Sequence, residues 1–375
     1  MNSSITIRPV HSRADERAFI RLQYAMYKDY PFWVPPLLMD RKKLIDRKNN
    51  PFYQHARMEM FLAERNGTLV GRIAGIVNDN HIREHKENIG FFGFFECIND
   101  QSVANALFDA AIAWLKGQKV TGVRGPASPS VNDEYGLLIE GFDRTPTILM
   151  PYNPPYYATL IEKYGFAKVK DLYAYEVNRD DVMTERLVRV SEALKKRDGF
   201  TFRSLNMKEF DKEVEVIHEL YTRGWERNWG EVPLTDAEFN YMAKDLKAIV
   251  NPELVVIAEL NGKPIGFGMS LPDLNEILQF NKSGMLLPAL VRMLLFKKRI
   301  RSIRIIILGV MPEYLTTGVG AVLFYETAVR AVANRYPYGE ASWVLEDNLM
   351  MNRGAKLLNG KLTKRYRLYQ MDFTA

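Results

Sequence analysis

Two glycines separated by one residue, Gly318 and Gly320, stand where a strand should give way to a helix. The residues before them, 305–311, are a β-branched apolar run typical of a buried strand, and Pro312 then removes a donor from the ladder. The residues after them, 320–336, carry apolar side chains at helical spacing. A glycine-rich turn that starts a helix exposes backbone N–H groups and the positive end of the helix dipole. The turn therefore predicts an anion site, such as one for phosphate.

Two common phosphate loops do not fit this stretch. A Walker loop requires Gly-Lys-Ser/Thr where the helix begins, but here the helix begins Gly320-Ala321-Val322. A dinucleotide fingerprint requires a third glycine and a turn directly after the strand, but Leu323 stands at that position and residues 312–317 intervene.

A third loop fits better. The frame Leu308-x-Val310-x-Pro312-x-Tyr314, followed by Gly318-x-Gly320, resembles the acyl-CoA loop of the GNAT superfamily of N-acetyltransferases. The family usually has Arg or Gln where this chain has Leu315, a departure that removes a side chain but keeps the backbone donors. The resemblance implies acetyl-CoA or another acyl-CoA as the cofactor. It also implies a cofactor-binding set of Val310, Met311, Thr316, Thr317, Gly318, Val319, Gly320, Ala321 and Asn348.

Acylation of an amine needs a base for the ammonium proton and an acid for the departing thiolate. The tyrosine that often serves as the acid in this family has no counterpart here, because Ile161 and Ala355 stand at the corresponding positions of the two halves. Glu346 and Asp347, at the end of the strand expected over 339–348, are candidate bases. The alternative is that they are solvated carboxylates at a strand end.

The sequence repeats one order of predicted strands and helices. Residues 61–76 and 256–271 each read as a strand, an Asn-Gly turn and a second strand, which is a strong hairpin signal. Each hairpin precedes another apolar strand and a long amphipathic helix, at 102–118 or 320–336. This order predicts an α/β (α+β) fold with a mixed, mostly antiparallel sheet, built as two GNAT-like modules in tandem.

The predicted modules cover 1–178 and 199–375, and a charged linker helix at 179–198 joins them. The first module has no glycine between Gly93 and Gly117, where the CoA loop should be. Its CoA site is therefore expected to be degenerate, and the acyl-CoA is expected in the second module.

An insertion in the first module, 125–157, is rich in Pro and Gly but also in aromatic residues, which favours an ordered and functional loop. Asp133 and Glu134 near its tip are predicted to contact substrate, and the alternative is that the loop covers an exposed sheet edge.

Residues 285–304 are apolar almost throughout and then strongly basic. The plainest interpretation is a buried helix with a solvated end. The alternatives are a pocket for a long acyl chain and docking on an anionic membrane surface.

The length, composition and net charge limit the number of domains, the class of ligand and the cellular compartment. The 375 residues suit two domains, and 47% hydrophobic with 26% charged residues is typical of a globular protein. A net charge of +6 suits anionic small ligands but is too weak to indicate nucleic acid. The single Cys97 excludes an intrachain disulfide, and with an N-terminus lacking an apolar signal region it indicates the cytoplasm. No metal site is expected, and His81 and His85 should be a solvated pair.

Together these features predict a cytoplasmic acyl-CoA-dependent N-acyltransferase, with acetyl transfer to an amine of a small molecule or other acceptor as the first interpretation. A non-catalytic CoA-binding or partner-binding module is one alternative. A long-chain acyltransferase acting on a lipid-like substrate is the other.

Overall fold

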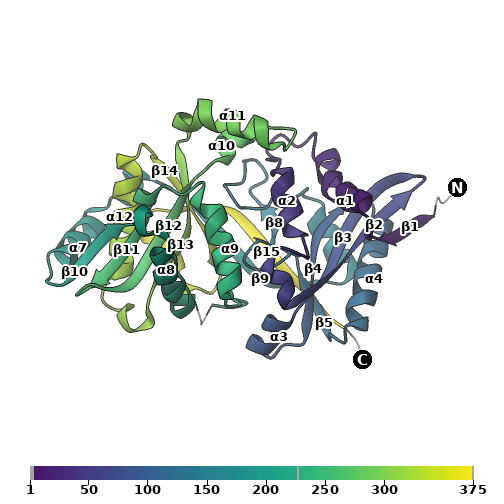
Figure 1. The fold of residues 1–375 in the computed structure, drawn as a ribbon, viewed down its shortest axis with the longest axis horizontal. Helices are drawn as coiled ribbons and strands as arrows, with labels where there is room; N and C mark the ends of the chain where they lie inside the picture. The colour runs from purple at the N-terminus through teal and green to yellow at the C-terminus, as the bar shows by residue number, and fades with distance from the viewer. Residues whose placement is uncertain (1–3, 226–227, 374–375) are drawn as a thin grey trace. The chain divides into compact units, whose positions relative to one another are not determined.

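The computed structural model describes residues 4–225 and 228–373, and the chain divides into two compact units (Figure 1). Unit 1 consists of Met1–Asp171, Leu278–Leu294 and Lys364–Ala375. Unit 2 consists of Leu172–Ile277 and Leu295–Thr363. Each unit therefore draws on more than one stretch of sequence.

The sheet of unit 1 is antiparallel from its first strand to its fourth, and the fourth pairs in parallel with the fifth. These strands are β1 (Ile5–Pro9), β2 (Ala56–Arg65), β3 (Thr68–Asn78), β4 (Ile89–Cys97) and β5 (Gly122–Gly125). The next neighbour of β5 is an antiparallel strand from the far end of the chain, β15 (Lys361–Asp372).

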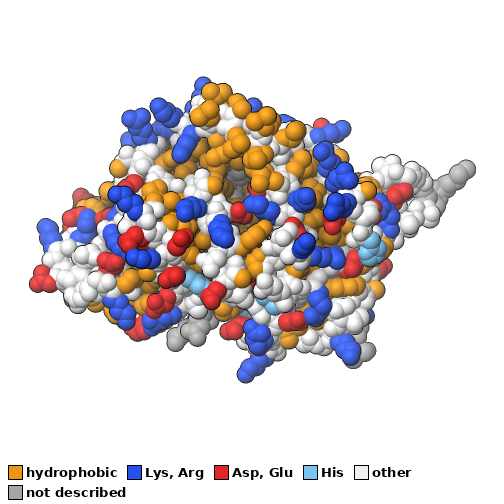
Figure 2. All heavy atoms as spheres, in the orientation of Figure 1, with side chains coloured by type: hydrophobic (Ala, Val, Ile, Leu, Met, Phe, Trp, Pro, Cys, Tyr) orange, Lys and Arg blue, Asp and Glu red, His pale blue; other side chains and the backbone are white. Residues whose placement is uncertain are grey.

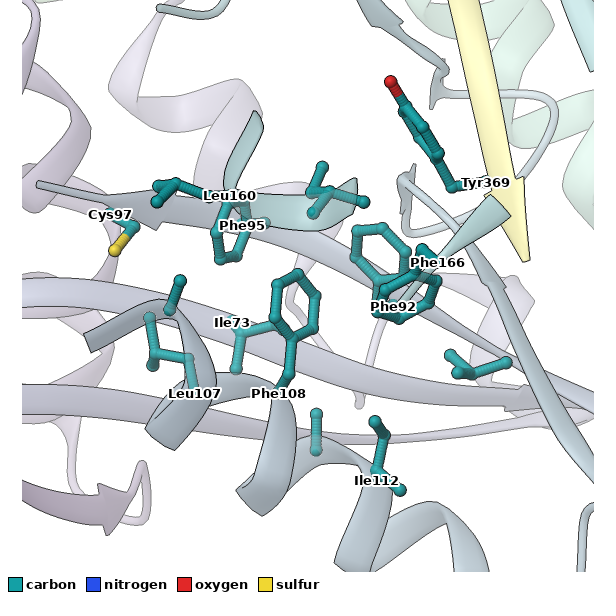
Figure 3. Close-up of a cluster of buried hydrophobic side chains, with 14 of the residues drawn as sticks. Ile73, Phe92, Phe95, Cys97, Leu107, Phe108, Ile112, Leu160, Phe166 and Tyr369 are labelled. Carbon is teal, nitrogen blue, oxygen red and sulfur yellow. The ribbon is translucent and has the colours of Figure 1, made fainter. Parts of the chain in front are cut away.

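The helices of unit 1 are α1 (Arg13–Met26), α2 (Leu38–Leu44), α3 (Asp79–His85), α4 (Gln101–Gly117) and α5 (Tyr157–Tyr164). The insertion between β5 and α5 contains three short strands, β6 (Ala127–Ser128), β7 (Glu134–Tyr135) and β8 (Leu137–Glu140). Helix α4 buries one face against the sheet, where Phe108 stacks on Phe95 and meets Phe92 edge-on (Figure 3). Tyr369 of β15 belongs to the same apolar cluster.

Unit 2 repeats this order of strands and directions. Its strands are β10 (Phe200–Ser204), β11 (Val255–Leu260), β12 (Lys263–Pro272), β13 (Ser302–Val310) and β14 (Tyr338–Leu345). The parallel pair is β13 with β14, and the antiparallel neighbour of β14 is β9 (Ala167–Asn178), which comes from the first half of the sequence.

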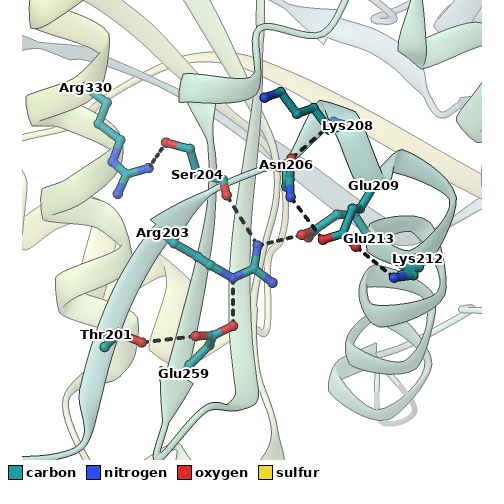
Figure 4. Close-up of polar contacts among 10 residues, drawn as sticks. All are labelled: Thr201, Arg203, Ser204, Asn206, Lys208, Glu209, Lys212, Glu213, Glu259 and Arg330. Carbon is teal, nitrogen blue, oxygen red and sulfur yellow. Dashed lines mark hydrogen bonds and ion pairs between the residues drawn. The ribbon is translucent and has the colours of Figure 1, made fainter.

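The remaining helices are α6 (Arg179–Val182), α7 (Glu185–Lys195), α8 (Phe210–Trp225), α9 (Asp236–Lys247), α10 (Asn275–Leu278), α11 (Leu286–Phe296), α12 (Val319–Ala333) and α13 (Leu349–Leu357). Arg203 of β10 lies between Glu259 and Glu213, at 2.7 Å from each, and so ties α8 to the edge of the sheet (Figure 4). Arg330 of α12 donates to Ser204 Oγ at 2.8 Å.

The predicted fold class is confirmed, and so are both hairpins. Asn66 and Gly67 have φ values of 53° and 76°, and Asn261 and Gly262 have 52° and 76°. Two successive residues with positive φ are what a type I′ turn requires, which is why Asn-Gly marks both positions.

The units differ from the predicted modules 1–178 and 199–375 in how they end. β9 pairs within unit 2 and β15 pairs within unit 1, so the two halves of the sequence exchange their last strands. The segment predicted as a linker helix, 179–198, is two helices, and α7 packs on α12 within unit 2. Tyr325 Oη donates to Glu192 at 2.9 Å there, and Lys195 pairs with Glu326 at 2.9 Å.

If β15 completes the core of unit 1, Tyr369→Ala should be strongly destabilising. The variant empties a fully buried position and should lower the free energy of unfolding by about 3–5 kcal/mol. Leu362→Ala on the same strand is the control, because that side chain is 41% exposed and its loss should cost little. Urea denaturation followed by circular dichroism measures both, and equal effects of the two variants would contradict the assignment.

Candidate functional site

The glycine loop lies at the start of α12, as the sequence predicted. β13 ends at Val310, Met311 is buried behind it, and Gly318 is the N-cap residue with φ 89°, without a side-chain cap. A Cβ placed on Gly318 would meet no atom within 4 Å, so this face of the loop is open. Because the first N–H groups of a helix have no intrahelical acceptor, the loop offers donors to an anion.

The other predicted loop residues differ in exposure. Thr317 Oγ1 donates to the carbonyl of Tyr314 at 2.6 Å and accepts from Val319 N at 3.4 Å, which fixes the turn. The side chain of Val319 is buried, Thr316 is exposed, and Gly320 and Ala321 are half-buried.

The parallel strands beside this loop separate. Paired residues join β13 to β14 from Ser302↔Tyr338 to Ile305↔Ala341, four pairs in all. Beyond them β13 continues to Val310 and β14 to Leu345, with no further pairing between these described residues. A register shift lies on the outer side of each strand, at Met269/Ser270 in the pairing of β12 with β13 and at Ala341/Val344 in that of β14 with β9.

A buried arginine stands where the strands separate. Arg304 of β13 donates through Nε to Ser342 Oγ at 3.0 Å and through Nη2 to the carbonyl of Ser342 at 3.1 Å. Ser342 Oγ in turn donates to Glu340 at 2.9 Å. The Ser342 carbonyl of β14 therefore has a hydrogen-bond donor, Arg304, at the point where the ladder ends.

A cavity partly open to solvent lies in unit 2, and its walls come from α6, α12, α13, β9, β13 and β14. Its walls are mainly apolar side chains, among them Ile305, Phe324, Ala328, Val344, Met351 and Ala355. The cavity begins about one turn of α12 beyond the glycine loop, so the loop and the cavity border the same helix.

The predicted residues after β14 lie at the start of α13. Glu346 is half-buried and Asp347 is exposed. Asn348 is the N-cap of α13, and its side-chain oxygen accepts from Met351 N at 3.1 Å. The side-chain oxygen of Asn348 therefore caps the helix, and its side-chain nitrogen can still donate a hydrogen bond.

In unit 1 the corresponding places are filled by the chain itself. β4 and β5 pair over only three residues, Ile89 to Phe91, and the insertion then lies against β4. A Cβ on Gly93 would come within 1.7 Å of the Ala127 carbonyl oxygen, and Phe94 N donates to Ser128 Oγ at 2.8 Å. The close approach explains the glycine at position 93.

The start of α4 is likewise filled, by a carboxylate. Asp100 is the N-cap, accepts from Ser102 N at 2.8 Å, and pairs with Arg65 at 2.8 Å. The hydrogen bond from Ser102, followed by that from Arg65, lowers the pKa of Asp100 to about 2. A fixed negative charge therefore already occupies this helix terminus.

Asp133 and Glu134, the predicted contact residues of the insertion, both have partners inside unit 1. Ser130 Oγ donates to Asp133 at 2.6 Å. Glu134 accepts from both terminal nitrogens of buried Arg41, once at 2.7 Å. The two carboxylates order the insertion, while Glu346 and Asp347 belong to unit 2.

One carboxyl group of interest was not predicted from the sequence: Glu231, in the connection between α8 and α9. Tyr221 Oη donates to it at 2.5 Å. Burial raises the pKa of Glu231 to about 7, against the lowering effect of that hydrogen bond. Tyr221 packs in one apolar cluster with Met311, so this group lies on the sheet face that α8 covers. A single acidic residue just before the apolar "VPL" was the only available signal.

The prediction for the histidine pair was wrong. His81 is buried, with its ring 4.7 Å from that of His85 and 4.9 Å from that of Phe91. Among the described residues, no group of three or more His, Cys, Asp or Glu side chains could hold a metal ion. In the same part of the chain, every helix is too short or too polar to cross a bilayer.

Comparison with known proteins gives the family. No family model matches the chain. It is 34% identical over 375 residues to Protein YghO of Escherichia coli (strain K12), covering 97% of this chain and 94% of that protein. It is 35% identical over 381 residues to Bacterial ceramide synthase of Caulobacter vibrioides (strain NA1000 / CB15N), covering 98% of each. The chain belongs to the family of these two proteins.

Solved structures confirm the fold. A tandem GNAT protein from the clavulanic acid biosynthesis pathway matches 99% of both chains with a TM-score of 0.59 and 11% identity. A GCN5-related N-acetyltransferase from Sphaerobacter thermophilus matches 98% of this chain and 95% of its own, with a TM-score of 0.54 and 14% identity. This family member therefore has the GNAT fold, and the resemblance seen in the sequence is confirmed at that level.

The raised pKa of Glu231 predicts a stability that falls as the pH rises. The folded protein keeps the proton up to about pH 7, whereas the unfolded chain releases it near the ordinary value of 4.5, so unfolding becomes more favourable between these values. Between pH 5 and pH 8 the wild type should lose about 2 kcal/mol that Glu231→Gln retains.

Urea denaturation at several pH values measures this difference. Glu215→Gln, an exposed position on α8, is the control and should follow the wild type. Parallel curves for all three proteins would show that Glu231 titrates normally.

Proposed function

We propose that the protein is an acyl-CoA-dependent acyltransferase that binds its acyl-CoA in unit 2 and transfers the acyl group to an amine. The observation that carries this is the contrast between the units. Ala127, Ser128 and Asp100 fill the strand separation and the helix terminus of unit 1. In unit 2 the corresponding terminus begins with Gly318, which has an open face and no side-chain cap.

The proposed arrangement follows from the shapes of the two partners. The diphosphate of CoA would accept hydrogen bonds from the N–H groups of the glycine loop, where the helix dipole favours negative charge. The pantetheine arm carries amide groups and would run between β13 and β14, where the strand backbones lack each other as partners. The acyl end would then reach the apolar cavity beside α12.

The transfer itself forms a C–N bond and breaks the C–S bond of the thioester, while the nitrogen loses a proton and the thiolate gains one. Glu346 and Asp347, at the end of β14, remain the proposed bases from the sequence. Glu231 is an additional candidate, because a carboxylate with a pKa of about 7 can accept a proton near neutral pH. Asp133 and Glu134 would act by ordering the insertion that fills unit 1.

Two observations favour a long acyl chain over acetyl. The cavity of unit 2 is lined mainly by apolar side chains, which suits a hydrocarbon chain. One relative is named a ceramide synthase, and a ceramide is the amide of a fatty acid with a long-chain amino alcohol. We therefore propose a long-chain acyl-CoA as the donor and a lipid-like amine as the acceptor.

Thermal shift followed by turnover tests the proposal. A ligand at about 100 times its dissociation constant adds about 2.7 kcal/mol of stability, so CoA and palmitoyl-CoA should both raise the melting temperature. Release of CoA thiol from palmitoyl-CoA, dependent on a long-chain amino alcohol, would identify an enzyme. Stabilisation without turnover would indicate a binding module instead, and no stabilisation by any CoA thioester would reject the proposal.

The first variant tests which unit binds CoA. Gly320→Val should weaken CoA binding about tenfold or more, or about 1.4 kcal/mol, because the added side chain obstructs the approach of the diphosphate. The protein itself should tolerate the change, since a Cβ there meets only Val310 Cγ2, at 3.9 Å.

Ser102→Ala, at the start of α4 in unit 1, is the matched control and should leave CoA affinity unchanged. Isothermal titration with CoA compares the variants. The reverse pattern, with Ser102→Ala weakened and Gly320→Val unaffected, would place CoA in unit 1.

The second variant tests the acyl cavity. Ala328→Phe fills part of it and should reduce stabilisation by palmitoyl-CoA while leaving that by CoA and acetyl-CoA intact. Ala113→Phe makes the same change on the exposed face of α4 and should alter neither. Equal loss for all three ligands would mean that the cavity holds the pantetheine arm and not the acyl chain.

A further inference from the structure

Helix α11 is exposed although its side chains are almost all apolar, which contradicts the interpretation of residues 285–304 as a buried helix. Ala289 is 1% exposed, whereas Leu287 and Leu294 are 71% and 85% exposed. Met285, Leu290 and Leu295 are also exposed. We call the exposed apolar residues of 285–295 the apolar patch. A helix that is apolar on all sides is normally buried, so a patch of this kind marks an interaction surface.

Positive charge accompanies the patch along the whole segment. Lys282 precedes it, Arg292 lies within it, and exposed Lys297, Lys298 and Arg299 follow it directly. The sequence has no Asp or Glu from residue 277 to residue 312. Figure 2 shows the orange side chains gathered over the position of α11, with blue side chains beside them.

The long cationic side chains lie along apolar surface. The Arg292 guanidinium is 5.4 Å from the centre of the Phe280 ring, and that of Arg299 is 4.8 Å from the centre of the Phe296 ring. Such side chains can keep their charge at the level of lipid headgroups while their methylene groups remain in an apolar layer.

We propose that the apolar patch docks on an anionic lipid surface, with α11 lying in the plane of the interface. The helix has 11 residues and is therefore about 16 Å long, so it can lie on a bilayer but not cross one. Apolar side chains enter the boundary of the acyl layer, and the cations attract anionic headgroups; these are the two contributions that hold interfacial helices.

The charge pattern favours lipid over a second protein as the partner. A protein surface would need acidic groups matched in position to Lys297, Lys298 and Arg299, as well as an apolar groove shaped for the leucines. A lipid surface supplies both properties without a fixed geometry. Docking is independent of the proposed acyl transfer, although it would bring the protein to the place where a lipid-like acceptor lies.

Co-sedimentation of the full chain with vesicles tests the proposal. We expect binding to vesicles of phosphatidylcholine with phosphatidylglycerol, weaker binding to phosphatidylcholine alone, and weakening of the former by salt. Leu287→Glu/Leu294→Glu should reduce binding at least about tenfold, because two charges would enter the apolar layer. Lys297→Glu/Lys298→Glu should abolish the preference for phosphatidylglycerol.

Val190→Glu/Met207→Glu is the matched control, since both side chains are exposed apolar residues outside the patch. It should bind vesicles as the wild type does. The melting temperature of every variant, with and without CoA, separates docking from folding and from the proposed CoA site: Leu287→Glu/Leu294→Glu should keep the wild-type response to CoA.

Either of two kinds of result would overturn the proposal. One is a wild-type protein that stays in the supernatant with phosphatidylglycerol vesicles, or a Leu287→Glu/Leu294→Glu variant that still sediments. The other is a concentration-dependent dimer, seen by light scattering and lost in that variant without vesicle binding in the wild type, which would assign the patch to a second copy of the chain.

Discussion

The early end of the ladder between β13 and β14 is the constraint on which the site depends. Two parallel strands that separate leave N–H and C=O groups without their usual partners, and buried groups of this kind must be satisfied in another way. Arg304 satisfies one of these groups, because it donates hydrogen bonds to the carbonyl and to the hydroxyl of Ser342. Further along, β13 continues to Val310 and β14 to Leu345 without pairing to each other among the described residues.

Unit 1 meets the same constraint with its own chain. Its insertion brings the Ala127 carbonyl onto Gly93 and the Ser128 hydroxyl onto Phe94 N, so the chain itself supplies a partner to the β4 backbone. Asp100 does the same at the helix terminus. One architecture therefore yields a unit filled by its own insertion and a unit whose corresponding helix begins with an open glycine, and a few local contacts account for the difference.

Local signals in the sequence predicted the parts that depend on local physics. The Asn-Gly turns identified both hairpins because their backbone needs positive φ at both residues, and the glycine loop identified the start of α12. Pairing partners were not predictable, because alternation shows that 172–177 is a strand but not that β14 is its neighbour. Helix α11 shows a related limit: uniform apolarity normally means burial, and no pattern within the helix distinguishes a protein interior from an external apolar surface. Glu231 was missed because its raised pKa comes from residues that surround it only after folding.

The exchange of last strands also sets when the sheet of unit 1 can be completed during synthesis. β5 of unit 1 must wait for a partner in which Tyr369 lies opposite Gly125, 244 residues later. Until then one edge of β5 stays open, and an open strand edge invites pairing with other chains. The nascent sheet of unit 1 is therefore exposed to misassembly until β15 has been made.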